Sequence, residues 1–448
     1  MQLISREKNK MWNNLWPPNM NNTPATKSFP PFHLSVIPLF PHSLIPSSLA
    51  FVLFLLIGVS CKGIAGDKPD SGEVWVGTWG TAPQLVEPGN MPPKPGLNNS
   101  TLRQIVCVSI GGNRLRFRFS NEFSGSPVTM KTVRVAASLG GSVIDTTTDR
   151  ELSFGGRPEA VLAPQSAMTS DPIDFDLKPR MNVAITIFFD STSPDVTGHP
   201  GSRTTSYILP GNGASSADLP GAVGTDHWYI INAIDVVAPD SAAAVVVLGN
   251  SITDGRGSGT NKQDRWPDEL ALRLQASPGM RRVAVLNMGI GGNCVLRNCL
   301  GPAAGSRFER DVISQHGVRW LIILEGINDI GQARGEEGSA SVADGLIAEY
   351  KRMIDRAHAM GIRVYGATLL PFGGSFYDSP GHRAAWKKVN DWIRKGGCFD
   401  AVIDFDAALH DPADPSHLLP SGDTGDHLHP NEVGHKMMGD AVDLMLFK

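Results

Sequence analysis

The sequence predicts an α/β fold, namely a three-layer α/β/α sandwich with a parallel sheet in residues 241–448, preceded by a β-sandwich-like domain in residues 71–240. In the C-terminal half, short apolar runs alternate with segments of helical periodicity, which indicates parallel strands joined by right-handed crossovers. Upstream lies a region rich in Gly, Ser, Thr and Val, in which apolar and polar residues alternate with a period of two. The 448 residues, with 41% apolar content, are enough for two cores.

Residues 1–70 are expected to be a leader segment outside the fold. The apolar run LAFVLFLLIGV, residues 49–59, is too short to span a bilayer but typical of the core of a secretory signal. Its end, GVSC, resembles a bacterial lipoprotein processing site that would make Cys61 the lipidated first residue, with cleavage after Ala65 as the alternative. Translation could also begin at Met11 or Met20. We therefore expect an exported protein, either secreted, periplasmic or a cell-surface lipoprotein.

The segment TLRQIVCVSIGGNRLRFRFSNEF predicts two strands joined at residues 111–113 as a hairpin. Its second strand carries three apolar side chains on a core face and three arginines on a solvated face, namely Leu115, Phe117 and Phe119 against Arg114, Arg116 and Arg118. VTMKTVRVAAS and NVAITIFFD add further alternating strands. We expect a β-sandwich that lies against the domain that follows it.

Aromatic residues of this region could stack on sugars or belong to the core or an interface: Trp75, Trp79, Tyr207, Trp228 and Tyr229. Core and interface positions are the commoner use of such side chains, so we favour that interpretation. A glycan-binding platform remains the alternative.

The C-terminal region alternates strands with helices. Strands are expected to begin near residues 244, 283, 319, 362 and 401, and helices to cover 264–275, 306–316, 340–360, 382–395 and 431–446. In the third helix an apolar stripe recurs at helical spacing and predicts a buried face: Val342, Leu346, Tyr350, Met353, Ile354 and Ala357.

The first polar motif is VVVLGNSITDG, residues 245–255, where a buried strand runs into a turn and a helix. Ligands of parallel sheets bind at the carboxyl ends of the strands, so Ser251 stands where a nucleophile would be exposed. Backbone N–H groups at the start of the next helix can face an anion. The alternative is that Ser251 only caps that helix.

Two further motifs follow strands. In NMGIGGN, residues 287–293, glycines permit close backbone approach, so the N–H of Gly292 could face a ligand. A plain flexible turn is the alternative. In LIILEGINDIG, the Asn328 amide is a neutral donor suited to a developing oxyanion, or else a helix cap.

The fourth motif is GDHLHPNEVGH near the C-terminus. Asp426 and His429 stand three residues apart, so the carboxylate could orient the imidazole while the imidazole takes a proton from Ser251. His427 and His435 compete for the role of base. Metal binding is a further alternative, but no other His or Cys recurs at the spacing of zinc ligands. We expect no cofactor and no metal.

These four motifs, in this order, resemble the SGNH or GDSL-type hydrolase family of esterases and lipases, in its bacterial two-domain form with an N-terminal β-rich domain. The resemblance covers roughly the last two hundred residues. It implies an SGNH-hydrolase-like fold with Ser251 as nucleophile and Asp426 and His429 as its partners. It also implies an oxyanion hole made by Ser251, Gly292 and Asn328.

The chain departs from the family at Asn250, where many members have Asp. That aspartate is not one of the family's catalytic groups, so we expect activity to survive. We expect an exported serine esterase that removes acyl groups, above all acetyl, from carbohydrates. The alternatives are a lipase or arylesterase on small acyl esters, an O-acyltransferase of the same mechanism, and a non-catalytic glycan-binding lipoprotein in which Asn250 marks the loss of activity.

The charge of the chain indicates which class of binding partner to expect. The formal net charge is −4 and the basic residues are scattered, which gives no sign of nucleic-acid binding, so an acylated small molecule or polysaccharide is the expected partner.

Cys294 and Cys299 are close enough for a small-loop disulfide, while Cys107 and Cys398 suit buried thiols.

Overall fold

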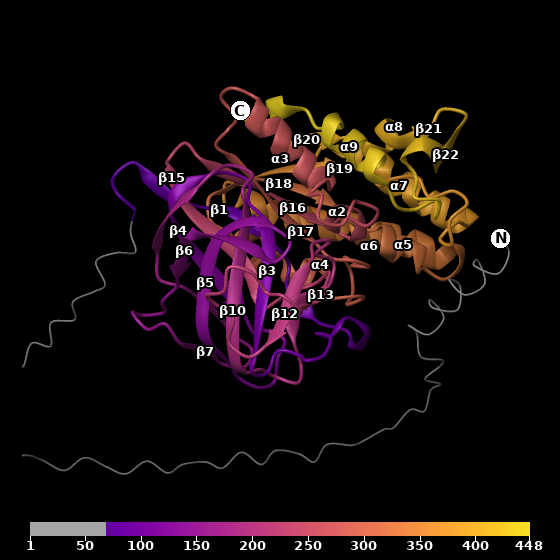
Figure 1. Cartoon of the computed structure of the whole chain (residues 1–448). Helices are drawn as coiled ribbons and strands as arrows, with labels where there is room; N and C mark the ends of the chain where they lie inside the picture. Colours follow the sequence, from indigo (N-terminus) through magenta and orange to yellow (C-terminus); the bar gives the residue numbers. More distant parts are fainter. Residues whose placement is uncertain (1–68) are drawn as a thin grey trace, which may run out of the picture. The chain divides into compact units, whose positions relative to one another are not determined.

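The computed structural model describes residues 69–448 (Figure 1). The apolar run 49–59, Cys61 and Ala65 lie outside the described residues. The described residues form one compact unit. Within it we call residues 73–239 the β part and residues 243–448 the α/β part. The placement of a domain boundary at residue 240 stays a prediction.

The β part is built from antiparallel sheets, as the sequence predicts. One sheet has five strands: β1 (Glu73–Gly80), β15 (Ile231–Pro239), β4 (Gly112–Ser120) and β8 (Ala167–Thr169), with β9 (Ile173–Leu177) paired to β4. A second has seven: β13 (Val223–Thr225), β12 (Ser206–Pro210), β3 (Ser100–Cys107), β10 (Asn182–Ser191), β5 (Val128–Gly140) and β6 (Val143–Glu151), with β7 (Ala160–Leu162) paired to β5. A third has three: β14 (Trp228–Tyr229), β11 (Thr197–His199) and β2 (Gln84–Leu85).

The predicted hairpin of residues 101–123 is wrong. Strands β3 and β4 both form but lie in different sheets, β3 between β12 and β10 and β4 between β15 and β8. A period of two identifies a strand and its buried face, but it does not identify the neighbouring strand. The connection is tight, because a Cβ at Gly111 would collide with the carbonyl of Leu177. The predicted core face is confirmed, since Leu115, Phe117 and Phe119 are fully buried.

The arginine face of β4 is only partly solvated, where the sequence predicts a solvated face, because Arg114, Arg116 and Arg118 are all half-buried. Arg116 pairs with Asp235 at 2.9 Å, and its Nη2 lies 2.9 Å from Nε2 of His316. Arg118 donates to Oε1 of Gln315 at 3.0 Å. Residues 315 and 316 belong to the α/β part, so this face is partly covered by it.

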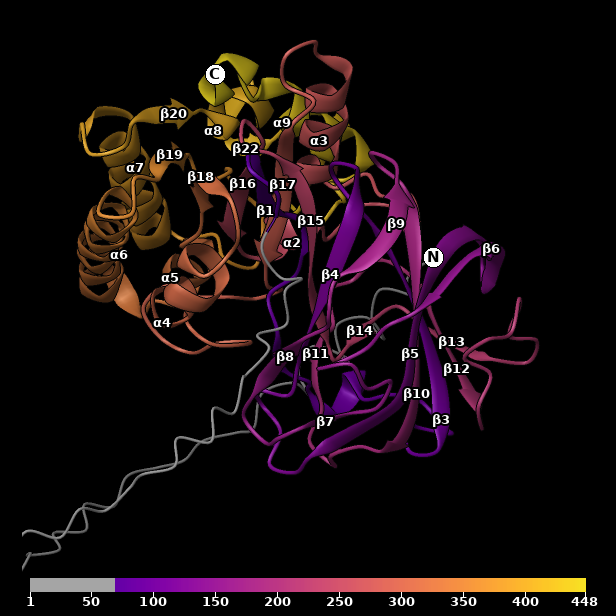
Figure 2. The same ribbon diagram turned by 90° about the vertical axis from the view of Figure 1, so that its left-hand side faces the viewer.

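The α/β part holds a parallel five-stranded sheet in the order β17 (Val283–Gly289), β16 (Ala243–Gly249), β18 (Val318–Leu324), β19 (Arg363–Ala367) and β20 (Ala401–Ile403). Helices α3 (Trp266–Ala276) and α9 (Glu432–Ala441) pack together on one face, and α6 (Gly335–His358) and α7 (Pro380–Lys395) pack together on the other (Figure 2). The predicted three-layer α/β/α sandwich is confirmed. The strand order reverses at β16, and ligands of such sheets bind beyond the strand ends at that point.

Several helices differ from their predicted bounds. Predicted helix 306–316 is α4 (Ala304–Phe308) continued by a π-turn (Glu309–Ile313), and the last predicted helix stops at Ala441 before a 3₁₀ turn (Leu444–Phe447). Short elements that no periodicity could reveal are α2 (Ser251–Asp254), α5 (Ile327–Gly331), α8 (Phe405–Leu409), and the hairpin of β21 (His410–Asp411) and β22 (Asp414–Leu418). In the predicted stripe of α6 only Val342 is not fully buried. Within residues 69–448, no helix has the length and apolar character to cross a membrane.

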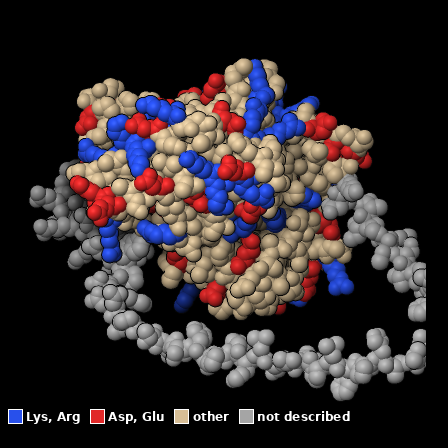
Figure 3. All heavy atoms as spheres, turned by 180° about the vertical axis from the view of Figure 1, so that it is seen from behind, with Lys and Arg blue, Asp and Glu red and all other residues tan. Residues whose placement is uncertain are grey.

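The β part covers the outer edge of strand β17. Ser109 donates its hydroxyl hydrogen to the carbonyl of Val285 at 2.8 Å and accepts from the N–H of the same residue at 3.0 Å. Gly77 leaves no space for a Cβ beside Leu286. An open strand edge favours aggregation, so these contacts make the β part a structural cover for the sheet. On the face that Figure 3 shows, acidic and basic side chains are interspersed.

Most of the aromatic residues considered for sugar stacking are core residues. Trp79, Trp228 and Tyr229 are buried, and the ring of Trp79 meets that of Trp228 edge to face at 5.1 Å. These three therefore cannot form a sugar platform. Trp75 lies under the guanidinium of Arg116 at 4.4 Å.

Candidate active site

The turn that carries Ser251 is set by the end of strand β16. Asn250 is the N-cap of α2, since its Oδ1 accepts from the N–H of Ile252 at 3.1 Å. The interpretation of Ser251 as a mere helix cap is therefore wrong. Gly249 has no space for a Cβ beside Thr253, so the chain turns tightly. Ser251 stays 7% exposed, which leaves its hydroxyl reachable at the carboxyl end of the sheet.

Ser251, His429 and Asp426 form one hydrogen-bonded chain. Oγ of Ser251 lies 2.9 Å from Nε2 of His429, and Nδ1 of His429 lies 2.8 Å from Oδ2 of Asp426. The other oxygen of Asp426 accepts from the backbone N–H groups of Leu428 and His429, at 3.0 and 2.9 Å. Because the carboxylate can only accept, Nδ1 carries the proton and Nε2 is free to accept from the serine.

The surroundings favour a charged Asp426 and a neutral His429. Burial acts to raise the pKa of Asp426, but the hydrogen bond and charge of His429 and the two backbone donors outweigh it and lower that pKa. Burial lowers the pKa of His429, Asp426 opposes this, and the positive charges of Arg256 and Arg203 add to the lowering. A neutral imidazole is the form that can take a proton.

The two competing histidines are occupied elsewhere. His427 is half exposed, and its Nδ1 lies 2.7 Å from Oδ2 of Asp423. His435 is fully buried, with Nδ1 accepting from the N–H of Trp266 at 3.3 Å and Nε2 donating to the carbonyl of Arg256 at 3.1 Å. The structure thus brings only His429, of the three histidines in this motif, to the serine.

Gly292 and Asn328 lie beside the serine turn. The N–H of Ile290 donates to the carbonyl of Gly249 at 3.0 Å, which joins the Gly292 turn to the serine turn. Gly292 has φ 68°, a conformation that favours glycine. Across residues 69–448, the N–H groups of Ser251 and Gly292 find no hydrogen-bond acceptor. Both donors are available for a ligand.

The Asn328 amide is held in one orientation. Its Nδ2 donates to the carbonyl of Asn293 at 2.7 Å, and its Oδ1 accepts from the hydroxyl of Tyr377 at 3.0 Å. Burial raises the pKa of Tyr377, so the hydroxyl keeps its proton. One N–H of the amide remains for a ligand. Gly326, not Asn328, occupies the N-cap position of α5, which excludes the alternative role of helix cap.

A fully buried arginine joins these turns. The guanidinium of Arg307 donates to five groups around it: the carbonyls of Gly249 (3.1 Å) and Met288 (2.7 Å), Oδ1 of Asn293 (3.0 Å), Asp311 (2.9 Å) and Glu325 (3.4 Å). No pattern in the sequence indicates this role, because a single arginine in a helical segment usually faces solvent. Tyr377 was likewise missed.

Glu325 completes the buried network beside Asn250. Burial raises the pKa of Glu325 to about 8, with Arg307 opposing and Asp329 adding to the rise. Nδ2 of Asn250 lies 3.4 Å from Oε2 of Glu325 and 3.5 Å from the carbonyl of Leu324. Asn250 is thus both a helix cap and a buried donor.

The loop after Gly292 is closed by a disulfide between Cys294 and Cys299, as predicted. Oδ2 and Oδ1 of Asp329 accept from the N–H groups of Val295 and Leu296, at 2.8 and 3.0 Å. The loop is therefore tied to α5, which carries Asn328. Cys107 and Cys398 are free thiols and only partly buried.

Comparisons with known proteins agree on the α/β part. Residues 247–437 match the model of the GDSL-like Lipase/Acylhydrolase family. Similar solved structures include a GDSL-like lipase from Bacteroides thetaiotaomicron VPI-5482, with 20% identity over 44% of this chain and 84% of the other and a TM-score of 0.32. Another is an acetyl xylan esterase from Geobacillus stearothermophilus, with 22% identity over 45% of this chain and 94% of the other and a TM-score of 0.34.

No curated protein matches the chain. No group of three or more His, Cys, Asp or Glu residues within the described part of the chain is placed to hold a metal ion. All the site residues of the four motifs, from Ser251 to His429, fall inside residues 247–437. These residues therefore belong to the GDSL-like lipase/acylhydrolase family, and the chain carries a carboxylic ester hydrolase domain.

Proposed function

We propose that the protein is an exported serine esterase. In it, Ser251 is the nucleophile, His429 is the general base, and the carboxylate of Asp426 orients His429. The observation that supports this best is the unbroken hydrogen-bond chain from Oγ of Ser251 through His429 to Asp426, at 2.9 and 2.8 Å. An oriented base next to a hydroxyl is the arrangement that activates a weak nucleophile.

In the first step, His429 takes the proton of Ser251 while Oγ attacks the ester carbonyl. The carbonyl oxygen becomes an oxyanion that faces the N–H groups of Ser251 and Gly292 and the amide of Asn328. Each such donor is worth roughly 3 kcal/mol of transition-state stabilisation. His429 then gives its proton to the leaving alcohol, and an acyl-enzyme remains. In the second step, His429 activates water, which releases the acid and restores Ser251.

We further propose that the acyl group is short, with acetyl esters of carbohydrates as the preferred substrates. Two bulky side chains adjoin the proposed oxyanion donors and support a small acyl site. Leu300 fills the space beside Gly292, where a Cβ would lie 2.8 Å from its Cδ1. Tyr377 lies against Asn328 at 3.0 Å. The leader run 49–59 supports export to where polysaccharides are found.

The test is hydrolysis of p-nitrophenyl esters of increasing chain length by the purified protein and its Ser251→Ala variant. Ser258→Ala is the matched control, because that hydroxyl caps the carbonyl of Gly255 in the same loop. We expect activity that requires Ser251 and falls steeply beyond acetyl. A preference for long chains would contradict the acetyl assignment, and full activity in Ser251→Ala would contradict the mechanism. Transfer to an added sugar alcohol in preference to water would identify an acyltransferase.

A further inference from the structure

We propose that His199 of the β part is a positioning residue for the active site and acts through Asp254 on the turn that carries Ser251. This inference rests on the proposed function. It assigns the β part a share in catalysis, although the β part contributes no group of the hydrogen-bonded chain. Four sets of contacts support it.

First, His199 is a buried link between the two parts. Its Nδ1 lies 3.0 Å from the carbonyl of Ala82, and its Nε2 lies 2.8 Å from Oδ1 of Asp254. The side chains of His199 and Asp254 are 4% and 3% exposed. Each ring nitrogen therefore has a hydrogen-bond partner, one in the β part and one in the α/β part, so the ring is held from both sides. A buried pair of this kind adds little net stability but fixes geometry, and it is costly to break on one side.

Second, Asp254 is the last residue of α2, one turn after Ser251. A helix of four residues is not stable by itself, so its contacts with the rest of the protein determine its position. The carboxylate of Asp254 is closely packed between the loop that contains Gly201 and the loop that contains Gly291. A Cβ at Gly201 would collide with its carboxylate, and a Cβ at Gly291 would lie 3.4 Å from its Oδ2. The same carboxylate therefore touches the β part and the turn of Gly292.

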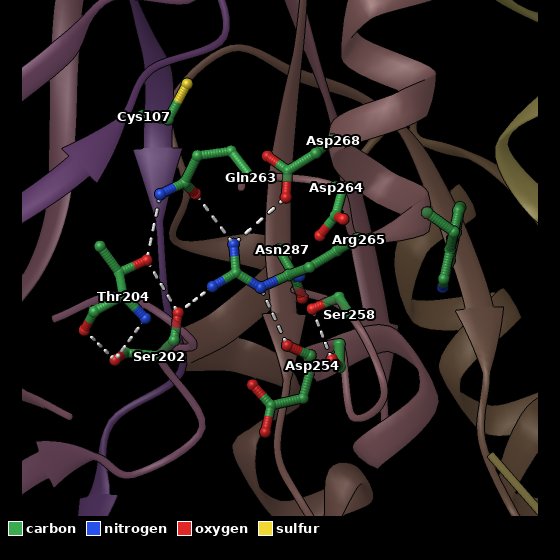
Figure 4. A network of polar contacts seen from close by, with 12 residues as sticks. Cys107, Ser202, Thr204, Asp254, Ser258, Gln263, Asp264, Arg265, Asp268 and Asn287 are labelled. Carbon is green, nitrogen blue, oxygen red and sulfur yellow. Dashed lines mark hydrogen bonds and ion pairs between the residues drawn. The ribbon is translucent and has the colours of Figure 1, made fainter. Parts of the chain in front are cut away.

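Third, the loop of residues 199–204 forms further hydrogen bonds with the segment after α2. Arg265 donates from Nε to the carbonyl of Asp254 at 3.1 Å and from Nη2 to the carbonyl of Ser202. Gln263 donates to Oγ1 of Thr204 at 3.1 Å. Figure 4 shows Ser202 and Thr204 on one side of this network and Arg265, Gln263 and Asp254 on the other.

Fourth, the ring of His199 is itself locked. It stacks on Trp228 with ring centroids 5.9 Å apart and 27° between the planes. The guanidinium of Arg265 lies over the same indole at 5.6 Å. The pair is thus a rigid connection, so a change in it is transmitted to α2.

The consequence is a specific kinetic effect. A shift of Asp254 moves both Oγ of Ser251 and the N–H of Gly292 relative to the ester. A misplacement of about 1 Å in reacting groups costs up to roughly 100-fold in rate. Substrate binding outside these two groups is unaffected, so the loss belongs to kcat and not to KM.

The experiment compares His199→Ala, His199→Gln, Asp254→Asn and the double variant His199→Gln/Asp254→Asn in the full chain. The control is His227→Ala, because Nδ1 of His227 lies 2.6 Å from the carbonyl of Pro200 in the same loop but on the β part. For each variant we would measure kcat and KM on p-nitrophenyl acetate, the melting temperature, and the rate at which a fluorophosphonate labels Ser251. Rates are taken per folded molecule.

We expect kcat and the labelling rate to fall together by about 10- to 100-fold in His199→Ala. KM should stay within about two-fold, and His199→Gln, which keeps one donor, should lose less. The double variant should lose less than the product of the single losses, because the pair acts as a unit. His227→Ala should match the wild type.

A lower melting temperature with unchanged kcat and labelling rate would overturn the proposal, as would a change confined to KM. If His199→Ala fails to fold, the same criteria apply to His199→Gln and Asp254→Asn. Failure of the proposed function is seen separately, because wild-type activity would then survive in Ser251→Ala. Loss of activity in Ser251→Ala together with full kcat in all the His199 and Asp254 variants contradicts the positioning role alone.

Discussion

At the scale of single residues, the polar motifs contained Ser251, His429, Asp426 and the proposed oxyanion donors, and three of the four motifs directly follow predicted strands of a parallel sheet. Sequence alone could not choose among the three histidines of residues 427–435. That choice depends on how the chain turns after Asp426, where two backbone N–H groups close on the carboxylate. Tyr377 and Arg307 were missed because their partners lie 49 and up to 58 residues away in the sequence.

The first prediction concerns the base. Replacing His429 by Ala should reduce kcat by several orders of magnitude, and Asp426→Asn by about 10⁴-fold through loss of the correct tautomer. The control is His427→Ala, because that half-exposed ring pairs with Asp423 and should matter little. Steady-state kinetics on p-nitrophenyl acetate measures kcat for each variant. The opposite ranking of the two histidines would show that His427 is the base.

The second prediction concerns pH. His429 must be neutral to accept the serine proton, so kcat/KM should fall as the pH drops through its pKa. Burial and two arginines lower that pKa, so the midpoint should lie below 6.5. A pH profile with a stable, uncharged ester tests this. A midpoint above 6.5 would mean that the Asp426 interaction outweighs burial.

The third prediction concerns Tyr377. In Tyr377→Phe the Oδ1 of Asn328 loses its donor, so the amide is no longer held with an N–H toward the oxyanion. Losing such a hydrogen bond costs about 1 kcal/mol, so kcat should fall roughly 5- to 10-fold with little change in KM. Tyr365→Phe is the control, since its hydroxyl donates to the carbonyl of Leu446. Equal kcat in the two variants would contradict a positioning role for Tyr377.

At the scale of elements, strands with strong apolar runs were predicted to within a few residues, and so was the buried stripe of α6. Periodicity did not give strand partners, so β3 and β4 were joined into a hairpin although they lie in different sheets. The turns α2 and α5 are too short for a 3.6-residue period to appear. These short elements carry Ser251 and Asn328, which are placed by caps and the buried network of Arg307.

That network gives the fourth prediction. Arg307→Met leaves the buried carboxylate of Asp311 with Arg310 as its ion-pair partner and removes the donor of Glu325 and of three further buried acceptors, which should cost about 3–5 kcal/mol of unfolding free energy. Arg356→Met is the matched control, because its ion pair with Glu309 is exposed and worth under about 1 kcal/mol. Chemical denaturation measures both. A loss of similar size in the two variants would show that burial of Arg307 has no special effect.

At the scale of the whole molecule, the fold class and the order of the two parts could be predicted, but their interdependence could not. Arg116 and Arg118 of β4 looked solvated in the sequence because their partners His316 and Gln315 lie about 200 residues further along the chain. The β part also contributes Ser109 to the edge of β17 and His199 to the serine turn. Contacts of this kind join residues that no local pattern relates.

The fifth prediction follows from these contacts. A fragment of residues 241–448 should be poorly soluble and nearly inactive, since it exposes the edge of β17 and loses the partner of Asp254. Size-exclusion chromatography, circular dichroism and esterase assays of the fragment test this against the chain from residue 66. A monomeric fragment with full kcat would contradict both the structural cover and the positioning role of His199.

Intact-protein mass spectrometry after reaction with a fluorophosphonate would show whether Ser251 is the nucleophile. We expect a single adduct, mapped by peptide sequencing to Ser251, which is absent in Ser251→Ala and forms far more slowly in His429→Ala. An adduct on another residue, or undiminished labelling of Ser251→Ala, would contradict it.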